Sequence, residues 1–321
     1  MSKKVESHSD INLHVAARNG DLNALINILE SGKVHVDCED SNGTTALILS
    51  SVNNHLMCLK ELINQGADIN HQRITGTTAL FFASQGGFIE IVKELLNNGA
   101  NPNIISHDSG SALLVACQCN HLDVVVELIS KNADIHKSLN DGASALFIAS
   151  QNNNLDVVKY LISKGADCNF IRKDEVSPVW IASQMGHVEI VKELLRNGAD
   201  PNIAKDNGST PLFKAAHKGY ILIVEELLKY NPNLMLLKNG ETVLHAACNF
   251  GQMKIAQLLL KHGANPELKN SDGLTCLDIA RQNNFVDLYK YLRSSLNNCD
   301  IESSNIKTQN NSQVNDMSTM V

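Results

Sequence analysis

A unit of about 33 residues recurs along nearly the whole chain, and this feature constrains the fold most. The copies align on one aliphatic position in a T-x-L-like turn, and successive copies lie 32 to 34 residues apart. The nine anchor residues are Leu13, Leu47, Leu80, Leu113, Leu146, Val179, Leu212, Leu244 and Leu277. One such unit cannot bury its own apolar stripe, so neighbouring copies must stack. The sequence therefore predicts a quasi-linear array over residues 10–294, although 321 residues alone would suggest two ordinary domains.

Each copy predicts two short helices. The first follows the anchor turn, and the second carries an amphipathic stripe, as in segment 89–97, where apolar residues recur at i, i+1, i+4 and i+5. Ser177 followed by Pro178, and Thr210 followed by Pro211, indicate helix starts, because a hydroxyl caps the first turn and proline needs no hydrogen bond there.

Glycine or asparagine stands at two fixed places in the copies, seven and nineteen residues after the anchor. These residue types adopt the left-handed conformation most readily and so end helices. The first set is Gly20, Asn54, Gly87, Asn120, Asn153, Gly186, Gly219, Gly251 and Asn284. The second set is Gly32, Gly66, Gly99, Asn132, Gly165, Gly198, Asn231 and Gly263. We expect a helix to end at each of these positions.

The composition excludes several functional classes. The net charge is −7 and no run of Lys or Arg exceeds two residues, which argues against a nucleic-acid binder unless Lys205, Lys214 and Lys218 cluster. The sequence shows no secretory signal, no membrane span and no lipidation motif. Eight cysteines without framework spacing indicate reduced thiols. We expect a cytoplasmic monomer without a cofactor, with a nuclear location left open.

Fragments such as GTTALFFASQGGFIEIVKELLNNGANPN, SPVWIASQMGHVEIVKELLRNGADPN and GSTPLFKAAHKGY resemble the ankyrin repeat. The resemblance covers about nine tenths of the chain. It implies an all-α solenoid of helix-turn-helix units joined by β-hairpin-like loops, with the first and last units as caps. It also implies a non-catalytic protein-interaction module, an adaptor or scaffold, that holds its partner in a concave groove.

Side chains five and six residues after the anchor are the candidate partner-binding residues, because by resemblance these positions face the groove. They are Gln85, Gln118, Gln151, Gln184, His217 and Asn249 at the fifth position, with Met185, Lys218 and Phe250 among those at the sixth. The alternative is that duplication simply copied the glutamines. One residue after the anchor stand Phe81, Phe147, Trp180 and Phe213, which either anchor a partner beside this ladder or pack between repeats.

A metal site or an enzyme is the competing interpretation. Cys117, Cys119 and His121 offer ligand types that zinc accepts. However, spacing of i, i+2 does not converge on a helix, and His121 occupies a repeat position that is also His55 and His187. No catalytic motif or phosphate-binding loop accompanies them. The repeat pattern therefore favours a structural role for these residues.

The flanking segments differ from the array. Residues 1–9 and 295–321 are polar and predict disorder. Thr319 and Val321 match a C-terminal ligand of PDZ domains, which hold the terminal carboxylate. The connection between the seventh and eighth copies is one residue short, so we expect a distorted hairpin or a small change in stacking angle near residues 230–238.

Overall fold

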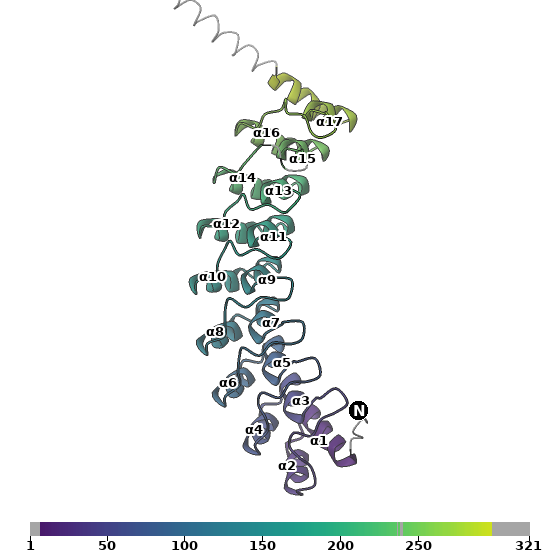
Figure 1. Ribbon diagram of the computed structural model, residues 1–321, viewed down its shortest axis with the longest axis vertical. Coiled ribbons are helices and arrows are strands. Elements are labelled where there is room, and N and C mark those ends of the chain that lie inside the picture. The colour runs from purple at the N-terminus through teal and green to yellow at the C-terminus, as the bar shows by residue number, and fades with distance from the viewer. Residues whose placement is uncertain (1–6, 236, 238–239, 297–321) are drawn as a thin grey trace, which may run out of the picture. The chain divides into compact units, whose positions relative to one another are not determined.

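The computed structural model describes residues 7–235, 237 and 240–296. The chain divides into two compact units, residues 1–178 and 179–321, and each is described by itself. In both units every repeat supplies the two expected helices, followed by a loop (Figure 1). Among the described residues the only β-structure is two antiparallel bridges inside such loops, Ile105 with Ser111 and Ser138 with Ser144. The all-α array of helix pairs and hairpin-like loops is thus confirmed.

The described residues of the first unit form ten helices in two rows. They are α1 (His8–Asn19), α2 (Leu22–Glu30), α3 (Ala46–Val52), α4 (Leu56–Asn64), α5 (Ala79–Gly86), α6 (Ile89–Asn97), α7 (Ala112–Gln118), α8 (Leu122–Ser130), α9 (Ala145–Gln151) and α10 (Leu155–Ser163). Odd-numbered helices pack on odd-numbered neighbours, and even-numbered helices on even-numbered neighbours. The long loops lie on the side of the odd-numbered row (Figure 1).

The second unit repeats this arrangement. Its helices are α11 (Pro178–Met185), α12 (Val188–Arg196), α13 (Pro211–Lys218), α14 (Ile221–Leu228), α15 (Val243–Asn249), α16 (Met253–Lys261) and α17 (Cys276–Gln282), and residues 286–296 are also helical. Helix α13 packs on α15, and α15 on α17. The odd-numbered helices of this unit therefore also form one row.

Hydroxyl caps start the odd-numbered helices. The Thr45 side chain accepts a hydrogen bond from the Ile48 amide, and Thr210 does the same for Phe213 at the start of α13. Ser111, Ser144, Thr242 and Thr275 cap α7, α9, α15 and α17 in this way. Helices α11 and α13 begin at Pro178 and Pro211, so both predicted helix starts are confirmed.

All seventeen of the predicted helix-ending residues have positive φ angles, between 48° and 94°. At Gly87 a second requirement adds to the backbone one, because a Cβ atom would lie 2.5 Å from the His121 ring of the next repeat. The repeat pattern therefore determines both the length of each helix and the closeness of neighbouring repeats.

Alanine lines the interface between odd-numbered helices, where Ala83, Ala116 and Ala149 are all fully buried. Their small side chains let the helices approach closely, and Leu128 and Leu161 fill the space behind them. A core of this kind needs few aromatic rings, which accounts for the aromatic content of 4%.

The structure moves two expected boundaries. Helix α1 begins at His8 because Ser7 and Asp10 form a capping box, so residues 8 and 9 belong to the array. At the other end the helix continues through residue 296. Residues 1–6 and 297–321, including Thr319 and Val321, lie outside the described residues.

The short connection keeps its turn. The Leu237 amide donates to the Glu241 carbonyl at 2.7 Å, as the Lys205 amide donates to Ser209 one repeat earlier at 3.1 Å. Asn231 has a φ of 48° and occupies the usual helix-ending place. The segment from Asn231 to Leu237 is therefore one residue shorter than the segment from Gly198 to Lys205, and residues 236, 238 and 239 lie outside the described residues.

Candidate interaction surface

Three predicted glutamines line up on the first unit. Gln85 is at the end of α5, Gln118 at the end of α7 and Gln151 at the end of α9, on helices that pack side by side. Gln85 and Gln118 are exposed, and Gln151 is half-buried. Their spacing follows from the repeat period, since each occupies the last turn of its helix. We call these three residues the amide row.

The second unit carries different side chains at the matching places. Gln184, His217 and Asn249 are half-buried, whereas Lys218 is exposed. Met185 is 46% exposed and Phe250 51%. The Phe250 ring lies with its centroid 4.3 Å from that of His217, with the two planes at 62°. This contact holds a large apolar side chain at the surface.

Trp180 does not share this exposure. Only 4% of its surface is accessible, and its indole N–H donates to the Ser209 carbonyl at 2.8 Å. Phe147 and Phe213 are buried as well. These contacts support the packing alternative for the aromatic position, so we leave Trp180 out of the partner surface.

The lysines singled out in the sequence do cluster. The Nζ atoms of Lys205 and Lys214 lie 5.5 and 5.6 Å from the centroid of the Trp180 ring. Burial, then the charges of Lys205 and Lys218, lower the pKa of Lys214. Sequence spacing alone could not show this cluster, because Lys205 comes from the loop before α13.

His217 lies within the same positive field. Burial first, then the charges of Lys214 and Lys218, lower its pKa below the ordinary 6.5 of histidine. The lowered pKa favours the neutral form of the ring at pH 7. Its Nδ1 atom is buried without a hydrogen-bond partner among the described residues. His217 accordingly supports Phe250 by packing and adds no positive charge at neutral pH.

The candidate metal ligands have other partners. Cys117 is fully buried and its burial raises the pKa of the thiol, whereas Cys119 is exposed. A His121 ring nitrogen is hydrogen-bonded to the Gln85 carbonyl at 3.1 Å, much as His55 is bonded to Arg18 at 2.9 Å. Within the described ranges no group of three His, Cys, Asp or Glu side chains is placed to hold a metal ion. Helix packing thus accounts for Cys117, and a hydrogen bond between repeats accounts for His121.

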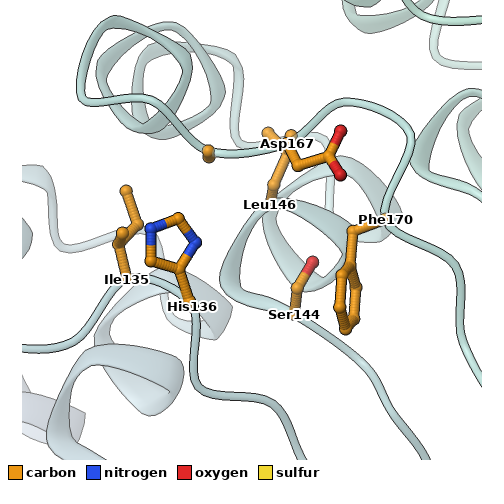
Figure 2. A pocket seen from close by; sticks show the side chains of 7 residues that line it. Ile135, His136, Ser144, Leu146, Asp167 and Phe170 are labelled. Atoms are coloured by element: carbon orange, nitrogen blue, oxygen red, sulfur yellow. The ribbon is translucent and has the colours of Figure 1, made fainter.

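A cavity of about 260 Å³ opens between two loops of the first unit (Figure 2). Ile135 and His136 lie on one side, and Asp167 and Phe170 on the other, with Ser144 and Leu146 behind them. His136 occupies the loop position at which two earlier repeats have asparagine. The cavity therefore lies at a place where the sequence differs from the repeat.

Asparagine at that position connects neighbouring loops. The Asn103 Oδ1 atom accepts from the Asp134 amide at 2.8 Å, and its Nδ2 atom donates to the Asn132 carbonyl at 2.9 Å. Asn70 makes the same pair of bonds to the Asn101 amide and the Gly99 carbonyl. An imidazole cannot make this pair of contacts in the same geometry, because it lacks the adjacent oxygen and NH₂ group of a carboxamide.

Replacing His136 by asparagine should stabilise the first unit by about 1 kcal/mol, because one carboxamide would make two loop-to-loop hydrogen bonds. Urea unfolding of the full chain, followed by circular dichroism, measures the change. The reverse substitution, Asn103→His, serves as the matched control and should destabilise by a similar amount. A His136→Asn midpoint equal to or below that of the wild type would contradict this account of the cavity.

Comparison with known proteins accords with this architecture. A family model described as "Ankyrin repeats (3 copies)" matches residues 13–106, 90–172, 166–236 and 215–305, which together cover most of the chain. The chain belongs to the ankyrin repeat family. Ankyrin repeats form a fold that generally mediates protein-protein interaction. In the described part of this ankyrin repeat protein, no helix combines the length and apolar character needed to cross a membrane.

Individual relatives match shorter segments. Ankyrin repeat domain-containing protein 29 is similar over 58 residues, with 57% identity in Danio rerio and 53% in Homo sapiens. The matched segment is 18% of this chain and spans only about a fifth of either relative. The crystal structure of the human ASB11 ankyrin repeat domain matches 68% of this chain and 96% of its own, with 27% identity and a TM-score of 0.61.

Proposed function

We propose that this ankyrin repeat protein is a non-catalytic adaptor or scaffold, which holds a protein or peptide against the face formed by its odd-numbered helices. The observation that carries the proposal is the amide row: Gln85 and Gln118 present exposed carboxamides at equal repeat positions on adjacent helices. A carboxamide donates and accepts hydrogen bonds, so a row of them suits the backbone of an extended segment. The proposal includes a cytoplasmic location, which we expect because the cysteines indicate reduced thiols.

Partner binding explains the even spacing of these side chains better than catalysis does. Catalysis needs several groups converging on one reacting atom. The amide row instead repeats one neutral group along adjacent helices. Such a surface recognises a partner by shape and scattered contacts, so it leaves the identity of the partner open.

The test compares two double variants of the full chain. Gln85→Ala/Gln118→Ala removes the exposed part of the amide row. Gln65→Ala/Gln257→Ala removes two exposed carboxamides near or on even-numbered helices. Proteins captured from cell extract by each immobilised variant are then quantified by mass spectrometry.

We expect a subset of captured proteins to fall at least about fivefold with the amide-row variant and to stay unchanged with the control, since a few central contacts dominate interface energetics. Equal capture by both variants and the wild type would contradict binding at the amide row. Circular dichroism of both variants confirms that each remains folded.

A further inference from the structure

The second unit carries cationic and apolar side chains on one row of helices. Lys214 and Lys218 stand one turn apart on α13 and share a helix face. On the flanking helices, Met185 ends α11 and Phe250 follows α15, at the same repeat position as Lys218. We call Met185, Lys205, Lys214, His217, Lys218 and Phe250 the basic-apolar patch.

The two lysines of α13 lack a local counter-charge among the described residues. The ion pairs among the described residues leave Lys214 and Lys218 without a carboxylate partner. Burial, and after it repulsion by Lys205 and Lys218, lowers the pKa of Lys214. The patch is positive on a chain whose net charge is −7. An incoming carboxylate would relieve this repulsion, whereas an incoming cation would add to it.

Apolar surface flanks the charge on both sides. About half of the Met185 and Phe250 side chains is exposed. The His217 ring packs against Phe250 at a steep angle, and the lowered pKa of His217 favours the neutral imidazole in this contact. A flexible thioether and a ring held in place together suit an aliphatic or aromatic side chain of a partner.

We propose that the basic-apolar patch binds an acidic peptide segment that also carries aliphatic or aromatic side chains. Its carboxylates lie against Lys214 and Lys218, and an apolar side chain contacts Met185 or Phe250. This inference rests on the proposed function, since it names the chemistry of a partner for the face formed by the odd-numbered helices. It goes beyond that function by assigning charge selectivity to the second unit.

Nucleic acid fits the same patch less well. A single strand binds by stacking bases on exposed aromatic rings along a continuous basic track. Here Trp180 is buried beneath Lys205 and Lys214, so Phe250 is the exposed ring of the patch. Three lysines would neutralise only a few phosphates against the overall negative charge. An acidic peptide gains from both the lysines and the apolar flanks.

Fluorescence anisotropy of the full chain tests the proposal with a fluorescein-labelled peptide of about twelve residues in which Glu pairs alternate with single Leu. Three further probes isolate each contribution: the same peptide with Gln for Glu, the same peptide with Ala for Leu, and a single-stranded DNA oligonucleotide of equal charge. Each is titrated at about 50 and about 300 mM NaCl, which changes the screening of surface charges.

Lys214→Glu/Lys218→Glu should weaken binding of the Glu/Leu peptide at least about tenfold, because attraction becomes repulsion at two sites. Lys254→Glu/Lys261→Glu, on α16 of the same unit, makes an equal change of net charge and should stay within about twofold of the wild type. Met185→Ala/Phe250→Ala should weaken binding about fivefold at either salt concentration. The Gln and Ala peptides should bind more weakly than the Glu/Leu peptide.

Equal losses in the two lysine variants would overturn the proposal, as would binding of the Gln peptide at full strength. Tighter binding of the DNA than of the peptide would overturn it in favour of a nucleic-acid surface. If the peptide fails to bind while the amide-row variant still loses captured proteins, the further inference fails and the proposed function stands. If the amide-row variant loses none, the proposed function fails independently.

Discussion

Trp180→Ala should lower the free energy of unfolding of the second unit by about 3–5 kcal/mol, the range for truncating a buried aromatic side chain. The ring is 4% exposed, and two lysine side chains cover it. Its loss would leave a void beneath Lys214 and would remove one of the two hydrogen bonds that the Ser209 carbonyl accepts, the other coming from the Lys205 amide. Urea unfolding followed by far-UV circular dichroism measures the effect, since Trp180 is the single tryptophan of the chain and its fluorescence disappears with it.

Trp180→Phe separates the contribution of apolar packing from that of the hydrogen bond to the Ser209 carbonyl. It retains most of the apolar packing but removes the indole N–H, one of two donors to the Ser209 carbonyl, so its cost should be about 0.5–1.5 kcal/mol, the net contribution of one hydrogen bond. A surface-exposed tryptophan that only contacts a partner would cost about 0.5 kcal/mol or less on truncation. A cost below about 1 kcal/mol for Trp180→Ala would therefore contradict the buried position of the ring.

The helix pattern of this chain could be predicted because it depends on local chemistry that repeats. A Gly or Asn at a fixed distance from the anchor determines a left-handed residue whatever surrounds it, as at Gly87 and Asn153. Hydroxyl caps such as Thr210 act within one turn of their own helix. Both signals recur along the array, so each copy that carries them supports the alignment of the others.

The surface chemistry could be predicted only in part, because it depends on contacts between different repeats. Lys205 reaches the Trp180 ring from a loop about 25 residues further along the chain, and no spacing rule indicates that contact. The cavity beside His136 becomes understandable only once Asn103 is seen to connect two loops. These features arise where one copy departs from the repeat, so the repeat cannot predict them.

The eighth position after the anchor shows how one structural role can be filled by two residue types. His55 and His121 each bring a ring nitrogen to the carbonyl of a residue at the end of the preceding odd-numbered helix. In the following repeat Asn154 takes this place, and its Nδ2 atom donates to the Cys117 carbonyl at 2.7 Å and to Gln118 at 3.3 Å. These bonds connect consecutive repeats where backbone carbonyls lack a partner within their own helix.

Asn154→Ala should destabilise the first unit by about 1–3 kcal/mol, because Asn154 is 6% exposed and its loss leaves the buried Cys117 carbonyl unpaired. Asn154→His should keep most of the stability, since imidazole fills this role in two other repeats. Asn152→Ala is the matched control: this exposed asparagine bonds only within its own helix, to Ile148, so we expect a change within about 0.5 kcal/mol.

Thermal and urea unfolding of the three variants show whether the side chain at this position stabilises the fold through its bond to the neighbouring repeat. If Asn154→Ala and Asn152→Ala lower the free energy of unfolding equally, the hydrogen bond between repeats adds no measurable stability. If Asn154→His costs as much as Asn154→Ala, the two residue types are not equivalent. Rescue by histidine would show that this position needs one nitrogen that reaches the carbonyl of the preceding repeat.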